Sequence, residues 1–129
     1  MFSINYKVTI SDINYGGHMG NERALILFQQ VRIDFYNSLG LSELNIGNGI
    51  GTIQKNSYVN YHKEIFLGQT LTVKIVSIEA FRTSFNIKYE VYNEENLLCI
   101  DGSTLIISYD YFHKKVCKLP SEFLVAIKL

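Results

Sequence analysis

The residues best suited to chemistry lie together near the start of the chain. The stretch reads Ser11-Asp12-Ile13-Asn14-Tyr15-Gly16-Gly17-His18-Met19-Gly20-Asn21. It offers a carboxylate, an imidazole and amides, separated by glycines that interrupt any regular period. A carboxylate can take a proton from water as a general base, or attack an electrophilic carbon as a nucleophile. Asp12 is therefore the first candidate for a catalytic group, in either of these two roles.

The end of this stretch coincides with the expected start of a helix. A helix N-terminus presents unpaired backbone N–H groups and a partial positive charge. Such groups can polarise a carbonyl and stabilise the oxyanion that forms when it is attacked. Simpler roles exist, since Asp12 can close a turn, His18 can be an ordinary loop histidine, and Asn21 can cap the helix. Gly17 and Gly20 can serve the turn alone or allow a ligand close to the backbone. The order of acid, glycines and helix start favours catalysis.

Helical spacing runs from position 21 to about 39. Apolar residues recur three and four positions apart, at Ala24, Leu27, Phe28, Val31, Phe35 and Leu39. Most polar residues of the segment fall outside this stripe, which predicts an amphipathic helix. Asn21 is a plausible N-cap and Gly40 a natural residue just after the helix. No second long helix is expected.

The rest of the chain has the alternation of strands. A first strand is expected from 2 to 10, and further strands from 52 to 62, 70 to 78, 84 to 92 and 97 to 109. Positions 93–96 form a polar hairpin turn, and positions 120–122 either start a short closing helix or end the last strand. Without further helices to make crossovers, the sheet should be mostly antiparallel. The fold class is therefore α+β, with one helix packed on a curled sheet.

Composition limits the classes of partner. The 129 residues suit a single domain spanning 1–129, and the 12 basic and 12 acidic residues cancel, which argues against nucleic acid as a partner. No apolar run suggests a membrane segment, and the first residues lack the features of a signal peptide, so we expect a cytoplasmic protein. Cys99 and Cys117 should be reduced thiols. His62 and His113 show no metal-ligand spacing with the other candidates, so no metal is expected.

The stretch from Asp12 to Asn21 resembles a family signature. It is similar to the pattern D-x-D-x-x-G-H-x-N-N of the 4-hydroxybenzoyl-CoA-thioesterase-like branch of the hot-dog superfamily. The matching positions are Asp12, Asn14, Gly17, His18, Gly20 and Asn21. The likeness continues through positions 29–36, 58–63, 67–71 and 82–85, so that it covers most of the chain. Asn14 stands where the family often has a second acid, and Gly20 where it often has Asn.

The resemblance implies a fold, an activity and a set of roles. The fold would be one long helix wrapped by a curled, mostly antiparallel sheet of five to six strands. The activity would be hydrolysis of acyl-CoA thioesters without a cofactor, with Asp12 as the catalytic carboxylate and backbone N–H groups around Gly20 and Asn21 polarising the carbonyl. His18 and Asn21 would line the site beside Gly17. Tyr61 would contribute to the acyl pocket, and Lys63 and Arg82 would bind the CoA phosphates.

Other readings of the same scaffold remain open. The thioester could be carried by acyl carrier protein instead of CoA. The chain could also be a non-catalytic module that binds acyl thioesters, and such a module would keep its function after Asp12→Ala. A hot-dog dehydratase or hydratase ranks lower, because no acid–histidine pair falls on the long helix. Open sheet edges favour a homo-oligomer, a dimer at least and a tetramer as the larger alternative.

Overall fold

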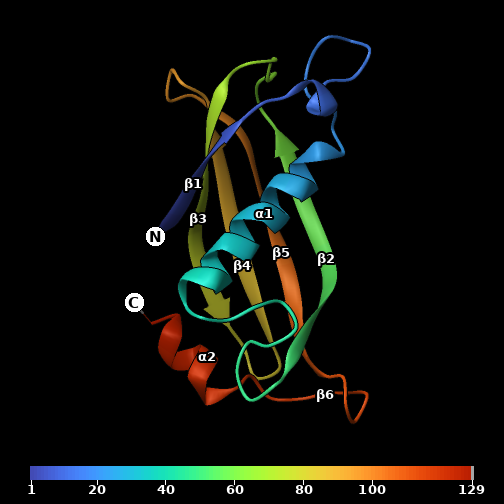
Figure 1. The fold of residues 1–129 in the computed structure, drawn as a ribbon, viewed down its shortest axis with the longest axis vertical. Helices are drawn as coiled ribbons and strands as arrows, with labels where there is room; N and C mark the ends of the chain where they lie inside the picture. The colour runs from blue at the N-terminus through green and yellow to red at the C-terminus, as the bar shows by residue number, and fades with distance from the viewer. Residues whose placement is uncertain (129) are drawn as a thin grey trace.

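A computed structural model describes residues 1–128 and shows a curved antiparallel sheet with one long helix across one face (Figure 1). The strands are β1 (Phe2–Lys7), β2 (Gly51–Tyr61), β3 (Thr70–Ala80), β4 (Ser84–Tyr92), β5 (Leu98–Asp110) and β6 (Lys115–Val116). The helices are the 3-10 turn η1 (Ile10–Asp12), α1 (Arg23–Ser38) and α2 (Ser121–Ala126). The main strands lie in the order β1-β3-β4-β5-β2, and every pairing is antiparallel. This is the predicted α+β arrangement of a hot-dog fold.

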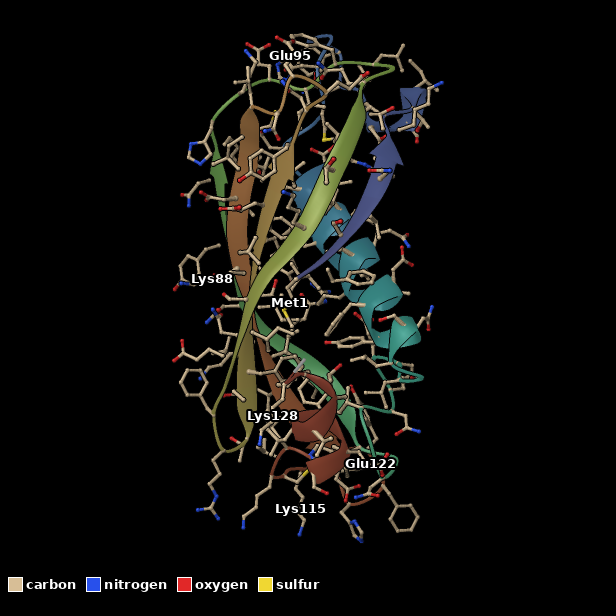
Figure 2. The ribbon with its side chains drawn as sticks, turned by 90° about the vertical axis from the view of Figure 1, so that its left-hand side faces the viewer. Met1, Lys88, Glu95, Lys115, Glu122 and Lys128 are labelled. Carbon is tan, nitrogen blue, oxygen red and sulfur yellow. The ribbon has the colours of Figure 1, made fainter. Side chains whose placement is uncertain are left out.

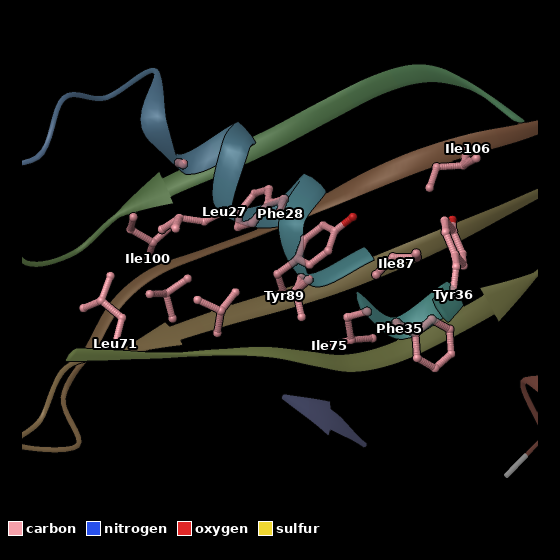
Figure 3. Packing of buried hydrophobic residues seen from close by; sticks show 14 of the residues in the cluster. Leu27, Phe28, Phe35, Tyr36, Leu71, Ile75, Ile87, Tyr89, Ile100 and Ile106 are labelled. Atoms are coloured by element: carbon pink, nitrogen blue, oxygen red, sulfur yellow. The ribbon is translucent and has the colours of Figure 1, made fainter. Parts of the chain in front are cut away.

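The core forms where α1 lies on the concave face of the sheet. From the helix, Leu27, Phe28, Phe35 and Tyr36 point at apolar side chains of β3, β4 and β5 (Figure 3). The Phe28 ring stacks on the Tyr89 ring, with centroids 4.2 Å apart. Burying these apolar surfaces is what holds a helix of this length on the sheet. On the opposite face, Lys88 points away from the helix into solvent (Figure 2).

Gly102 allows the helix to approach β5 closely. A side-chain carbon at this position would overlap the backbone oxygen of Tyr58 on the neighbouring strand and lie 2.8 Å from the ring of Phe28. Only a residue without Cβ fits there. Irregular pairing in β2, between Gln54 and Asn56, and in β3, between Ile75 and Ser77, adds local twist to the sheet.

The ends of α1 differ in how well the sequence predicted them. Gly40 follows the helix with a φ of 73°, as predicted for a residue just beyond a helix end. Asn21 was predicted as the N-cap, and this was wrong by one position. Glu22 takes the N-cap place, and no side chain makes a capping hydrogen bond there. The backbone N–H groups at the helix start are therefore left for other acceptors.

Several strand boundaries depart from the prediction by a few residues. The first strand ends at Lys7, because residues Ile10–Asp12 turn into η1 instead of extending the strand. The hairpin strand β6 was not predicted, since two residues carry no periodic signal. Of the two alternatives for positions 120–122, the short helix α2 is the one observed. Cys99 and Cys117 are both free thiols, as predicted.

Candidate active site

Three hydrogen bonds join the loop before α1 to η1, to the end of β2 and to the segment that follows β2. The Gly20 N–H donates to the Asp12 carbonyl oxygen at 3.0 Å, and the Met19 N–H donates to the Ile65 carbonyl oxygen at 2.7 Å. The Tyr61 hydroxyl, at the last residue of β2, donates a short hydrogen bond to the Asn21 carbonyl oxygen. The loop, the helix start and the segment after β2 thus meet at one end of the sheet.

A pocket of about 500 Å³ lies at this junction. It is lined by residues of the helix-start loop and of the segment that follows β2, together with one residue of β5: His18, Met19, Gly20, Asn21, Tyr61, His62, Lys63, Glu64, Ile65, Phe66 and Ile100. The lining contains both apolar and polar side chains, which suits a ligand that has an apolar end and a polar end. Five residues predicted from the sequence line this pocket, namely His18, Gly20, Asn21, Tyr61 and Lys63.

Two backbone donors at the helix start have no acceptor within residues 1–128. The N–H groups of Gly20 and Arg23 are satisfied, by Asp12 and Gly20 respectively, whereas those of Asn21 and Glu22 make no hydrogen bond there. The Asn21 carbonyl accepts from Tyr61, so the planar peptide unit directs the Glu22 N–H the opposite way, out of the helix start. Adjacent donors of this kind can stabilise a developing oxyanion.

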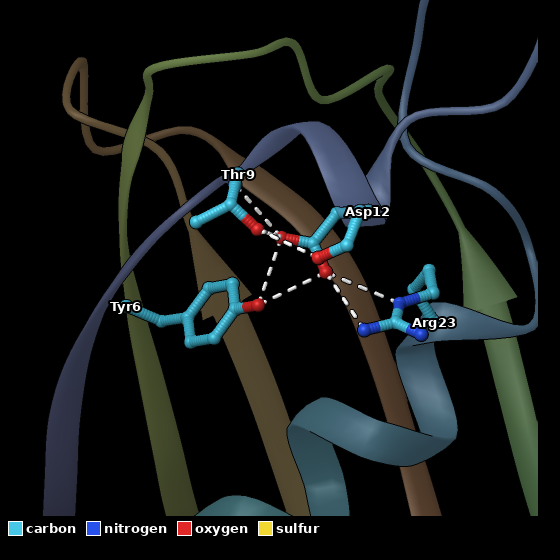
Figure 4. A network of polar contacts seen from close by, with 5 residues as sticks. Tyr6, Thr9, Asp12 and Arg23 are labelled. Carbon is cyan, nitrogen blue, oxygen red and sulfur yellow. Dashed lines mark hydrogen bonds and ion pairs between the residues drawn. The ribbon is translucent and has the colours of Figure 1, made fainter.

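Asp12 lies immediately behind the pocket wall, in a closed polar network (Figure 4). Its carboxylate accepts hydrogen bonds from the Tyr6 hydroxyl, at 2.9 and 2.8 Å to the two oxygens, and from the Thr9 N–H at 2.9 Å. Arg23 adds a hydrogen bond from Nε at 3.1 Å and an ion pair from Nη2 at 3.0 Å. The side chain of Asp12 is 1% exposed, and its acceptor positions are all occupied.

The network fixes the ionisation of Asp12. Burial favours its neutral form, but the hydrogen bonds from Thr9, Tyr6 and Arg23 outweigh burial and lower its pKa below the ordinary value. Asp12 is therefore a carboxylate at neutral pH whose oxygens already accept from Tyr6, Thr9 and Arg23. Its backbone carbonyl, which holds Gly20, ties this network to the pocket.

The other two predicted residues lie outside the pocket. Gly17 is in the loop tip, with a φ of 84° that favours glycine in the turn. Arg82 follows the far end of β3, roughly 30 Å along the strand from the pocket end, because eleven extended residues separate the two ends. The structure does not bring Arg82 to the pocket of its own chain.

His18 was predicted as a site residue, whereas Glu22 and Glu64 were not. His18 Nδ1 lies 3.2 Å from the Met19 carbonyl oxygen, which can only accept, so Nδ1 carries a proton. Glu64 lines the pocket, and Glu22 stands at the helix N-cap. Neither glutamate forms an ion pair within residues 1–128. No local spacing marks the two glutamates as site residues, because only the fold brings Glu64 to the helix start.

Neither a metal cluster nor a membrane-spanning element is found in the described part of the chain. Within residues 1–128, no three His, Cys, Asp or Glu side chains come close enough to share a metal ion. Over the same residues, no helix has both the length and the apolar character that crossing a bilayer demands.

Comparison with known proteins gives a family match over most of the chain. Residues 8–127 match the family described as the thioesterase-like superfamily. Among curated proteins, no sequence matches significantly.

Solved structures resemble the fold over nearly its whole length. A 1,4-dihydroxy-2-naphthoyl-CoA thioesterase from Synechocystis is 20% identical with a TM-score of 0.88, covering 98% of this chain and 95% of its own. A gentisyl-coenzyme A thioesterase is 16% identical with a TM-score of 0.84, covering 97% and 98%. A hypothetical protein from Staphylococcus aureus, in complex with CoA, is 21% identical with a TM-score of 0.84, covering 98% and 81%. At these identities the likeness establishes a shared fold.

Proposed function

Because the chain belongs to the thioesterase-like superfamily, we propose that it hydrolyses acyl-CoA thioesters to the free acid and CoA. The observation that carries this proposal is the pair of unengaged N–H groups, of Asn21 and Glu22, beside a pocket of about 500 Å³. A thioester carbonyl directed at these donors is polarised, and the oxyanion formed on attack by water is stabilised where the charge develops. Collapse of that intermediate expels the CoA thiolate, which takes up a proton.

The pocket residues suggest how the substrate lies. The apolar wall of Met19, Ile65, Phe66 and Ile100 suits the acyl group, and the ammonium group of Lys63 suits a CoA phosphate. Arg82 of the same chain is too distant for that role, so its contribution to CoA binding requires a second chain. The three similar structures named for CoA or a CoA thioester support a CoA substrate over acyl carrier protein.

For Asp12, we propose a positioning role. The role of base or nucleophile, predicted from the sequence, requires one of its oxygens to leave Tyr6, Thr9 or Arg23 and reach the pocket. Its backbone carbonyl already holds Gly20, and its side chain holds the first residue of α1. A loss of turnover by orders of magnitude in Asp12→Asn, with unchanged stability, would assign the proton transfer to Asp12 itself.

We also propose that the working unit is a homodimer joined along β2. This strand is an edge of the sheet, eleven residues long, and it exposes the apolar side chains of Ile53, Tyr58 and Tyr61. Unpaired edges of this length are normally covered, and pairing two of them continues the sheet across both chains. A two-fold axis pairs the two copies of β2 in opposite directions. The far end of one sheet therefore comes beside the pocket end of the other. Sedimentation of a monomer at micromolar concentration would contradict this arrangement.

The activity is tested by measuring thiol release from aromatic, short-chain and long-chain acyl-CoAs. We expect turnover with at least one class, and the preferred class identifies the acyl group. Binding of acyl-CoA without any thiol release would instead support the non-catalytic module. Turnover only with acyl carrier protein would reassign the carrier. The two free thiols are consistent with a reducing compartment such as the cytoplasm, which is where we propose that the protein meets these substrates.

A further inference from the structure

The carboxylate of Glu22 occupies the space beside Gly20 that a side chain would otherwise fill. A Cβ at position 20 would lie 2.5 and 2.7 Å from the two carboxylate oxygens of Glu22 and 2.9 Å from its carboxyl carbon. Gly20 lines the pocket, so this carboxylate lies next to a residue of the pocket lining. The absence of a side chain at position 20 is what gives Glu22 this location.

Nothing else in the described chain engages this carboxylate. Glu22 is exposed, and among residues 1–128 it forms neither a hydrogen bond nor an ion pair. Its charge is felt by the hydroxyl of Tyr61, because burial first and Glu22 second raise the pKa of that tyrosine. The Tyr61 hydroxyl donates to the carbonyl of Asn21, the residue directly before Glu22.

Asp12 and Glu22 differ in their availability to act as a general base. Asp12 is buried with its acceptor positions filled, whereas Glu22 is solvent-accessible and unengaged beside the two free N–H donors. A general base must reach the proton of the attacking water while the carbonyl sits on its donors. Glu64 itself lines the pocket, but it lies on the segment after β2 and not at the helix start.

We propose that Glu22 is the general base of this site, a proposal that rests on the thioesterase function above. Glu22 takes a proton from water as the water oxygen bonds to the thioester carbon. The carbonyl electrons move to the oxygen held by the N–H groups of Asn21 and Glu22. When the C–S bond breaks, the thiolate of CoA takes the proton from Glu22, and the new carboxylic acid releases its own proton to solvent.

The proposal is tested with Glu22→Gln, Gly20→Ala, the double variant and a matched control. Glu79→Gln makes the same change of charge at an exposed position at the far end of β3. In Gly20→Ala the new methyl group displaces the flexible end of Glu22 without meeting backbone, so the fold is retained. Steady-state kcat and KM are measured for each on the acyl-CoA that the wild type prefers, along with the pH profile of kcat/KM.

We expect Glu22→Gln to lower kcat about 100-fold or more with little change in KM, as for loss of a general base. The fall of kcat/KM at acid pH should vanish in this variant, and Glu79→Gln should match the wild type. Gly20→Ala should also lower kcat but have no further effect in the Glu22→Gln background, because both act on one carboxylate. Wild-type turnover retained in Glu22→Gln, or effects that multiply in the double variant, would overturn the proposal. A wild type inactive on every acyl-CoA would instead remove the proposed function.

Discussion

Asp12→Ala should destabilise the fold by about 3 to 4 kcal/mol, and the network around it gives this figure. Thr9 N–H and the Tyr6 hydroxyl each lose a buried charged acceptor, at about 1 to 1.5 kcal/mol apiece after partial relaxation. Arg23 loses its ion pair and contributes about 1 kcal/mol, since its side chain is 25% exposed and regains water. For a chain of 129 residues this corresponds to a fall in Tm of roughly 10 °C or more.

The assay is urea unfolding followed by circular dichroism, repeated between pH 7 and pH 3. The pKa of Asp12 is lower in the folded chain than the ordinary 3.8, so its carboxylate stabilises the fold fully above that value. This contribution is lost as pH falls through the lowered pKa. The difference between wild type and Asp12→Ala should therefore be largest near neutral pH and shrink in acid.

Asp34→Ala is the matched control, because Asp34 is an aspartate of α1 whose carboxylate, among residues 1–128, accepts only an exposed hydrogen bond from Gln30. It should change stability by less than about 0.5 kcal/mol. Asp12→Ala within that same margin at pH 7, or a difference from wild type that grows in acid, would refute the account of the network.

Three further substitutions test the packing and the pocket. Gly102→Ala should lower the free energy of unfolding in urea by about 3 kcal/mol, because the added Cβ meets the backbone of Tyr58 and the Phe28 ring. A loss under about 1 kcal/mol would contradict the close approach of helix and strand. Tyr36→Phe should leave stability unchanged or raise it by about 1 kcal/mol, since the buried hydroxyl has no hydrogen-bond partner among residues 1–128 and burial raises its pKa. A clear loss of stability would show that this hydroxyl is hydrogen-bonded in solution. Tyr61→Phe should lower thioesterase kcat more than stability, because the hydrogen bond to the Asn21 carbonyl aligns the helix start; equal kcat would show that this bond is dispensable.

The elements with strong periodicity could be predicted from the sequence. The stripe of α1 and the alternation of β3, β4 and β5 follow from burial of one face, and they place the helix start beside the loop that carries Asp12. Arg32 was the exception in the helix. It falls inside the buried stripe at 2% exposure, because its guanidinium donates to the Tyr89 hydroxyl at 3.0 Å, 57 residues away. Such a distant partner leaves no mark on local spacing.

The backbone segment that lines the pocket could be predicted from the sequence, but the surroundings of the acidic side chains could not. Glycines followed by a helix start indicate a backbone that a ligand can approach closely. Gly20 and Asn21 do line the pocket. The burial of Asp12 depends on Arg23 and Tyr6, which only the folded chain brings to it. Arg82 could have been placed correctly, because the turn after an antiparallel strand lies at the opposite end from where that strand begins.

Continuous thiol detection with wild-type protein is the most direct test of whether this pocket releases CoA from acyl-CoA. We expect CoA release above the rate in buffer for at least one of the aromatic, short-chain and long-chain acyl-CoAs. No release above that rate from any of them, by protein shown to be folded and assembled, would contradict it.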